Sequence, residues 1–121
     1  RDYFMIARNR GIRMIGDGAK EVHTIDPLKI RDAVLSYLNI NIEQFSSKLR
    51  FPAFIEARQI FCSLCRNMTK LSLREIGEFV RDDYNHASVI NSCKKARWYY
   101  EEEYEYRLKY WEIEKILNIF K

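Results

Sequence analysis

The residues of this chain that could carry out a chemical task stand at the start of a helical pattern near residue 85. The polar run Asn85–Ser88 directly precedes an apolar row at Val89, Ile90 and Cys93. At the first turn of a helix, side chains of these types can hydrogen-bond or contact base edges in the DNA major groove. This pattern therefore favours recognition of duplex DNA over the making or breaking of bonds.

Catalytic and metal-binding groupings do not emerge from the sequence. No pair of carboxylates, Ser/His/Asp set or Cys/His set is spaced for catalysis. Cys62 and Cys65 form a CxxC inside an apolar helical run, while His23 and His86 are isolated, so a zinc site would lack two ligands. We expect both cysteines in the core, and we expect no enzyme activity, metal or cofactor.

Two helices and a turn must position the run at residue 85. Ser72 followed by Glu75 is a capping box that predicts a helix from Leu73 to about Val80. Gly77 within it favours close packing of the two helices. The polar turn Arg81–Tyr84 follows, and the second helix opens at Asn85. This arrangement predicts a helix-turn-helix whose second helix enters the major groove.

The remaining pattern is helical, with no strand-rich region or repeat. Asp26 before Pro27 predicts a helix to about Leu38, followed by a short helix over 42–47 and a long one from Phe51 or Pro52 to about Thr69. A final helix is expected in residues 96–121. Its apolar face is expected to comprise Tyr100, Tyr104, Leu108, Trp111, Ile113, Ile116, Leu117 and Phe120.

The fold class is thus all-α, with about six helices. Residues 24–121 are expected to form the helix-turn-helix domain. Residues 1–23 are expected to be a lead-in segment, either a hairpin around residues 9–11 or a short helix broken at Gly11.

The charge distribution agrees with a nucleic-acid partner, and the hydropathy predicts no membrane span. The net charge is +4, and residues 28–100 carry twelve Lys or Arg against seven Asp or Glu. The positive excess therefore coincides with the helix-turn-helix. No run is apolar enough to span a membrane and no signal peptide is visible, so the cytoplasm is the expected location.

Three segments, in order along the chain, resemble one family. They are HTIDPLKIRDAVLSYLNINIEQFSSKLR, ARQIFCSLCRNMTKLSLREIG and NHASVINSCKK. Together they resemble the C-terminal DNA-binding domain of the bacterial replication initiator DnaA, which has a Trp-repressor-like helix-turn-helix fold. The resemblance runs from about Val22 to about Ala96, and it implies that the partner is double-stranded DNA.

The resemblance implies a role for each matching residue. Arg50 lies where the family places a minor-groove arginine. The matches to phosphate-contacting residues are Arg58, Gln59, Arg66 and Lys95. Thr69, Ser72 and Leu73 match the turn and helix start beside the DNA backbone. The base-reading signature falls on Asn85, His86, Ala87 and Ser88.

This chain departs from the family at the turn and at the signature. Arg81–Tyr84 is one residue longer than the family turn and lacks its glycines, and Asp82 and Asp83 would repel phosphate if they faced it. Asn85 replaces an aspartate, and Ala87 and Ser88 replace two threonines. Because asparagine pairs best with adenine, we expect a target sequence other than the family's usual one. The chain also has no Walker A loop, so we expect no ATPase activity.

Two further hypotheses stay open beside DNA binding. The chain is alternatively a protein-interaction module that kept the fold and lost base readout, or a remnant of a longer enzyme that acts on DNA. The aromatic C-terminal helix packs either internally or on a second copy, which would give a homodimer. Periodicity does not choose between these arrangements.

Overall fold

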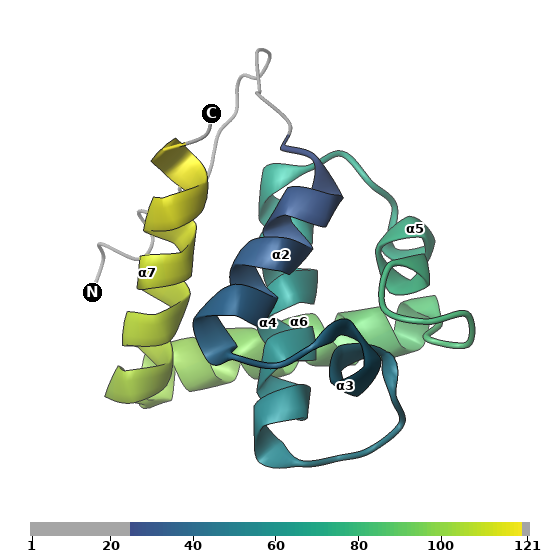
Figure 1. Cartoon of the computed structure of the whole chain (residues 1–121), viewed down its shortest axis with the longest axis horizontal. Helices are drawn as coiled ribbons and strands as arrows, with labels where there is room; N and C mark the ends of the chain where they lie inside the picture. Colours follow the sequence, from purple (N-terminus) through teal and green to yellow (C-terminus); the bar gives the residue numbers. More distant parts are fainter. Residues whose placement is uncertain (1–24, 120–121) are drawn as a thin grey trace.

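Six helices account for most of the residues that the structure, a computed structural model, describes (25–119). They are α2 (Pro27–Leu38), α3 (Ile42–Ser46), α4 (Pro52–Met68), α5 (Leu73–Glu78), α6 (His86–Glu102) and α7 (Tyr104–Ile119) (Figure 1). No strand occurs between residues 25 and 119. The all-α prediction and the order of its helices are confirmed, whereas the predictions for residues 1–23 lie outside the described part.

The first helices begin where their sequence signals predict. The Asp26 carboxylate accepts a hydrogen bond from the Leu28 N–H (3.0 Å), and Pro27 occupies the first helical position. Asn39 ends α2 in the left-handed conformation, with φ of 58°. Asn41 and Gln44 form a capping box at the start of α3. Local capping chemistry therefore fixes these boundaries.

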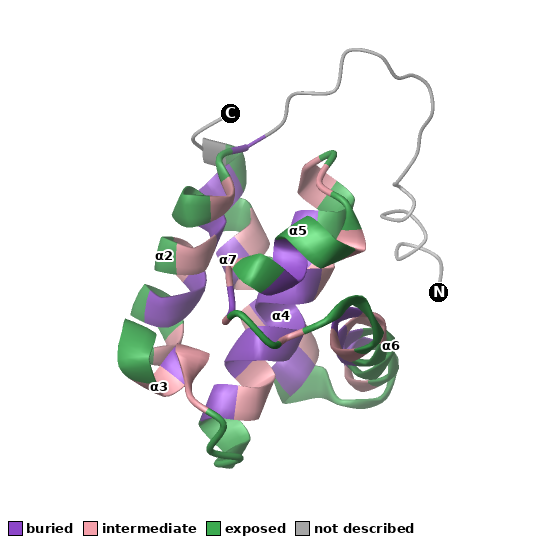
Figure 2. Cartoon of the chain, turned by 90° about the vertical axis from the view of Figure 1, so that its right-hand side faces the viewer, coloured by how far each residue is buried: buried purple, intermediate pink, exposed green. Residues whose placement is uncertain are grey.

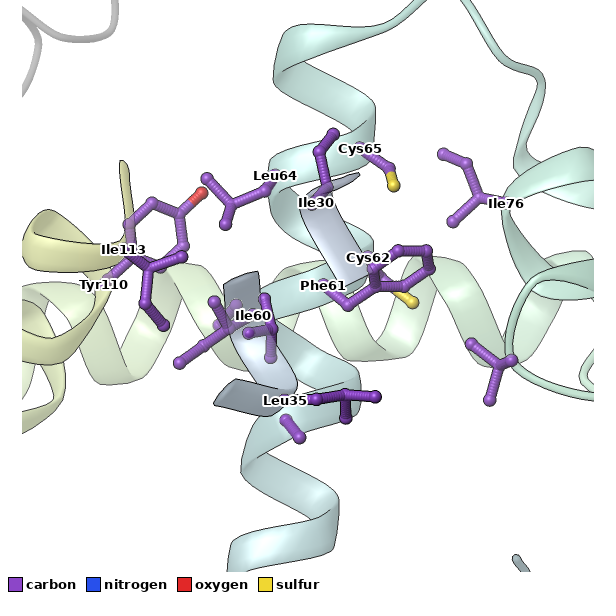
Figure 3. Packing of buried hydrophobic residues seen from close by; sticks show 14 of the residues in the cluster. Ile30, Leu35, Ile60, Phe61, Cys62, Leu64, Cys65, Ile76, Tyr110 and Ile113 are labelled. Atoms are coloured by element: carbon purple, nitrogen blue, oxygen red, sulfur yellow. The ribbon is translucent and has the colours of Figure 1, made fainter. Parts of the chain in front are cut away.

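Helix α4 forms the centre of the core. It packs against α2, α3, α5 and α6, and Figure 2 shows it as the most continuously buried helix of the view. Ile60, Phe61 and Leu64 of α4 are fully buried, and residues of the other helices surround them in Figure 3. Burial of such side chains contributes about 1.5–3 kcal/mol each, so α4 is the scaffold on which the other helices are placed.

The cysteines of α4 belong to this core, as predicted. Cys62 and Cys65 are both fully buried, and burial raises the pKa of each thiol. Between residues 25 and 119 no three His, Cys, Asp or Glu side chains gather as metal ligands would. Nor does any helix in this range combine the length and hydropathy needed to cross a bilayer.

The predicted apolar face of the last helix is wrong in part. Helix α6 continues to Glu102, Glu103 is extended (φ −123°, ψ 117°), and α7 starts afresh at Tyr104. The break resets the helical register. The buried face of α7 is formed by Tyr106, Tyr110, Ile113 and Leu117, whereas Tyr104, Leu108, Trp111 and Ile116 are exposed.

Two tyrosines secure α7 against α4. The Tyr110 hydroxyl shares a hydrogen bond with Ser63 Oγ (2.6 Å), and the Tyr106 hydroxyl donates to the Gln59 side chain (3.0 Å). Burial raises the pKa of both phenols, so each stays protonated at neutral pH. The aromatic helix thus packs internally along one face and leaves another face exposed.

Candidate DNA-binding surface

Helix α5 starts at the predicted capping box. Ser72 Oγ accepts from the Glu75 N–H (3.1 Å), and the Ser72 N–H donates to the Glu75 carboxylate (2.8 Å). Ile76 of α5 is fully buried, and Leu73 is half-buried against the core. The predicted helix extends to Val80, but the observed one ends at Glu78. The capping box therefore sets where α5 starts, and the apolar side that carries Leu73 and Ile76 sets how α5 is oriented on the core.

Gly77 allows the turn after α5 to fold back closely. A Cβ atom at this position would collide with the Tyr84 carbonyl oxygen and would lie 3.2 Å from Val89 Cγ2 of α6. Only glycine leaves room for the turn backbone here. The prediction that Gly77 allows close packing is confirmed, and the partner includes the turn as well as α6.

Tyr84 anchors the glycine-free turn to α6. Its hydroxyl shares a hydrogen bond with the buried Ser92 Oγ (2.5 Å), and the Arg81 guanidinium lies over its ring at 5.1 Å. Burial is the main cause that raises the Tyr84 pKa. These contacts give the turn a fixed path, although it contains no glycine.

Helix α6 presents its first turn to solvent. Asn85 is the N-cap, and its Oδ1 accepts from the Ser88 N–H (3.0 Å). His86 and Ala87 are exposed, Ser88 is half-buried and Val89 is fully buried. The start of α6 is thus anchored on one side and free on the other, as a recognition helix requires. In Figure 2, α6 is seen nearly end-on beside α5.

The loop between α3 and α4, residues 47–51, carries two basic residues and is called the basic loop below. Arg50 on it is exposed, and no hydrogen bond or ion pair of its side chain occurs with another described residue. Lys48 Nζ lies 2.9 Å from Asp83 Oδ2. The basic loop is therefore held beside the turn of the helix-turn-helix, so Arg50 and the start of α6 belong to one region of the molecule.

Arg58 lies beneath the basic loop rather than on the surface. It is 4% exposed; its Nε donates to the Phe45 carbonyl (2.7 Å), and its Nη2 donates to the carbonyls of Ser47 (2.7 Å) and Gln44 (3.1 Å). Burial, followed by the charges of Arg81 and Arg50, lowers the pKa of Arg58. Its first role in this structure is to fix the end of α3 and the basic loop.

Gln59 also lies in the interior, on another side of α4. It is 7% exposed, and its side-chain oxygen accepts from Tyr106 of α7. The side-chain oxygen of Gln59 is thus engaged within the protein, and the phosphate contact expected for Gln59 stays a prediction. The Arg-Gln pair is adjacent in sequence but diverges in space, because consecutive residues of a helix point about 100° apart.

The other predicted contact residues lie around the helix-turn-helix. Thr69 Oγ1 donates to the Cys65 carbonyl (2.6 Å) and accepts from the Leu71 N–H (3.2 Å), so it shapes the turn between α4 and α5. Arg66 and Lys95 are exposed on α4 and α6, and Arg66 approaches the Cys93 thiol, where it opposes the rise in pKa caused by burial. Both charges are available to a phosphate backbone.

The sequence reasoning missed some polar residues of this region. A surface hollow along α6 is lined by Lys95, which was predicted, and by four residues that were not, Asn91, Lys94, Trp98 and Tyr99. Their i, i+3, i+4, i+7 and i+8 spacing is a signal that could have found them. The contact of Lys48 with Asp83 and that of Arg81 with the Ser47 carbonyl leave no such signal, because each joins residues about 35 positions apart.

Comparison with known proteins supports the family assignment. The family model described as "Bacterial dnaA protein helix-turn-helix" matches residues 27–96. The "Chromosomal replication initiator protein DnaA" of Geobacter metallireducens is 38% identical over 84 residues, covering 69% of this chain and 18% of that protein. The protein of the same name from Bacteroides thetaiotaomicron is 28% identical over 105 residues, covering 87% of this chain and 22% of that protein.

The match is therefore to one part of those proteins: the chain spans about a fifth of their length. The matched range 27–96 contains the capping box, the close approach at Gly77, the turn and the exposed start of α6. On this match and this geometry, the chain belongs to the bacterial DnaA helix-turn-helix family.

Proposed function

We propose that this chain binds double-stranded DNA sequence-specifically, with the start of α6 in the major groove and the basic loop in the adjacent minor groove. The observation that carries the proposal is the exposed first turn of α6, which lies beside the basic loop in a member of this family. The related proteins are named as chromosomal replication initiators, so the proposed setting is DNA replication or transcription regulation in the cytoplasm.

Base reading falls to the four residues at the start of α6. His86 is exposed and can donate or accept at a base edge, and Ala87 can contact a thymine methyl group. The Oδ1 of Asn85 already accepts the capping hydrogen bond, so its amide N–H groups are what it offers to a base. Ser88 is half-buried and reaches a base through its hydroxyl. His86 is therefore the principal reader in this proposal.

Backbone contacts fall to the residues around the motif. Arg66 and Lys95 are proposed to contact phosphates, and Thr69, Ser72 and Leu73 to approach the backbone where α5 begins. Arg58 is proposed to act mainly through the loop that it holds. For Gln59, its contact with Tyr106 supports a role in holding α7 instead of a direct phosphate contact. Such contacts would make affinity fall with salt.

Selection of binding sites from random duplex DNA tests this proposal. The full chain is incubated with a random-sequence duplex pool at stated salt, and bound molecules are amplified and sequenced over several rounds. Enrichment of a defined motif supports the proposal. Binding that is sequence-blind and lost at moderate salt, or no binding at all, would show that base readout is wrong.

The alternative function is a protein-interaction module. The observation that favours it is the exposed aromatic face of α7, with Tyr104 at 68% and Trp111 at 47% exposure. A homodimer formed through this face remains a prediction. Sedimentation of the wild-type chain and of Trp111→Ser tests it: a dimer lost in the variant supports the prediction, and a wild-type monomer at high concentration refutes it.

A further inference from the structure

One carboxylate joins the turn of the helix-turn-helix to the basic loop. Asp83 Oδ2 lies 2.9 Å from Lys48 Nζ, and Asp83 Oδ1 lies 2.8 Å from Arg81 Nε. Arg81 Nη1 in turn donates to the Ser47 carbonyl (2.7 Å). We call this set of contacts the Asp83 bridge; it fastens two segments that lie 34 residues apart in the chain.

The basic loop is consequently held from two sides at Ser47. Its carbonyl accepts one hydrogen bond from Arg58 of α4 and one from Arg81 of the turn, both at 2.7 Å. Arg50, the proposed minor-groove residue, follows three positions later. The position of Arg50 relative to α6 therefore depends on contacts that originate partly in the turn.

The exposure of the Asp83 bridge argues against a role in stability. The side chains of Lys48 and Asp83 are 74% and 57% exposed, and ion pairs in such surroundings contribute little to folding. In a region that is proposed to bind phosphate, an ion pair has another consequence. It determines which Lys and Arg side chains already have an anionic partner within the protein and which do not. Lys48 is engaged with Asp83, whereas Arg50 is engaged with no other described residue.

Asp82 provides an internal comparison. It is exposed, it carries the same charge as its neighbour, and it makes no ion pair or side-chain hydrogen bond within residues 25–119. Hydrogen bonds from Lys48 and then Arg81 lower the pKa of Asp83. The two aspartates thus differ in partners while they share the same turn.

We propose that Asp83 is a positioning residue for DNA readout: it holds the Arg50 loop against the start of α6 and withholds Lys48 from phosphate. This inference rests on the proposed function and deepens it. With Asp83 present, Arg50 is presented at a fixed place and sequence-independent attraction is reduced. Without it, Lys48 is free to contact phosphate and the loop is held less firmly. Asp83 therefore raises the ratio of specific to random affinity.

Binding measurements on matched variants test the proposal. Asp83→Asn, Asp82→Asn and Asp83→Glu are compared with wild type on the selected duplex and on a scrambled duplex of equal length, across a salt series. Asp83→Asn is expected to bind the scrambled duplex more tightly, with a salt slope steeper by about 0.9, the value for one added phosphate contact. Its specific-to-random affinity ratio is expected to fall severalfold.

The controls separate positioning from simple charge. Asp82→Asn removes the same charge and is expected to keep the wild-type ratio, and Asp83→Glu is expected to restore most of it. Adding Lys48→Met to Asp83→Asn is expected to remove the extra affinity for scrambled DNA. Equal ratios for Asp83→Asn and Asp82→Asn, or an unchanged salt slope, would overturn the proposal.

A separate measurement shows whether the Asp83 bridge forms, independently of whether the chain binds DNA. The titration of the Asp83 carboxyl is followed by NMR in the free wild-type chain and in Lys48→Met. A depressed pKa that rises in the variant shows that the bridge forms in solution, whatever the DNA result. An ordinary pKa in wild type would overturn the bridge, while absence of any duplex binding would overturn the proposed function.

Discussion

At the scale of single residues, His86 and Arg58 show two ways in which a side chain can serve a binding surface. His86 is exposed at the start of α6, whereas Arg58 is buried under the basic loop with its Nε and Nη2 engaged by carbonyl oxygens. In the proposed complex, His86 would contact DNA directly, whereas Arg58 would hold the basic loop that contacts it. Their substitutions are therefore expected to differ in kind.

His86→Ala is expected to relax sequence specificity. Because the side chain is exposed, its removal leaves the fold intact, while loss of a base contact costs about 1–3 kcal/mol on the selected duplex. Affinity for a scrambled duplex is expected to change little. Equilibrium titrations of both duplexes measure this, and equal losses on the two would contradict the role given to His86.

Arg58→Ala is expected to destabilise the fold by about 1–3 kcal/mol, because the Phe45 carbonyl loses its buried hydrogen bond and the carbonyls of Gln44 and Ser47 each lose one of their donors. Urea unfolding of wild type and variant measures the difference. Arg66→Ala, at an exposed position of the same helix, is the control, and its effect is expected to stay within about 0.5 kcal/mol. Similar unfolding curves for the two variants would refute the structural role of Arg58.

At the scale of elements, the turn between α5 and α6 fixes where α6 begins. The Tyr84 backbone packs on Gly77, and the Tyr84 side chain reaches Ser92. A longer turn without glycine is thus accommodated by a close backbone approach and a buried hydroxyl pair. The same turn supplies Asp83 and Arg81 to the basic loop.

Gly77→Ala is expected to destabilise the chain by about 1–3 kcal/mol, the usual cost of forcing an extra carbon into a packed site. At an unconstrained helix position the same change would stabilise by about 1 kcal/mol. The sign of the change in unfolding free energy therefore shows whether the Tyr84 carbonyl leaves room for a side chain at residue 77. A variant as stable as wild type, or more so, would show that the Tyr84 carbonyl does not approach α5 as described.

The starts of helices could be predicted from the sequence because capping is local. The start of α2 is predicted by Asp26 before Pro27, and the start of α5 by Ser72 before Glu75. In both cases the signal lies within a few residues of the boundary. The register after Glu103 could not be predicted, because the run is free of Gly and Pro and reads as one continuous helix. The break is visible in the structure, in the extended backbone of Glu103 and in the burial of Tyr106 and Tyr110.

The outline of the candidate site could also be predicted, because its signals are local in the sequence. The polar run at residues 85–88 and the basic loop are sequence signals, and the family resemblance orders them. The interior positions of Arg58 and Gln59 depend on which face of α4 meets α3 and which meets α7. Those contacts join residues 13 and 47 positions apart, and no local pattern encodes them.

At the scale of the whole molecule, charge is distributed unevenly. Residues 28–100 hold a net excess of five positive charges, while residues 101–121 carry six Glu against four Lys or Arg. Helix α7, which belongs to the acidic part, lies on the opposite side of the molecule from α5 in Figure 1. This distribution favours an approach to DNA with the side that carries α5 and the start of α6.

The salt dependence of binding is expected to report this orientation. Arg66→Ala and Lys95→Ala are each expected to weaken binding to selected and scrambled duplexes alike and to make the salt slope shallower by about 0.9. Lys115→Ala, an exposed cation on α7, is the matched control and is expected to leave the slope unchanged. A slope that responds equally to all three would mean that no particular face meets the phosphates.

The central claim, that the start of α6 reads base sequence in duplex DNA, is tested most directly by one affinity ratio. The wild-type chain is titrated with the duplex enriched by selection and with a scrambled duplex of identical length and composition, at the same physiological salt. Binding to the selected duplex that is tighter by about a thousandfold or more is predicted. Equal affinity for the two duplexes would contradict the account.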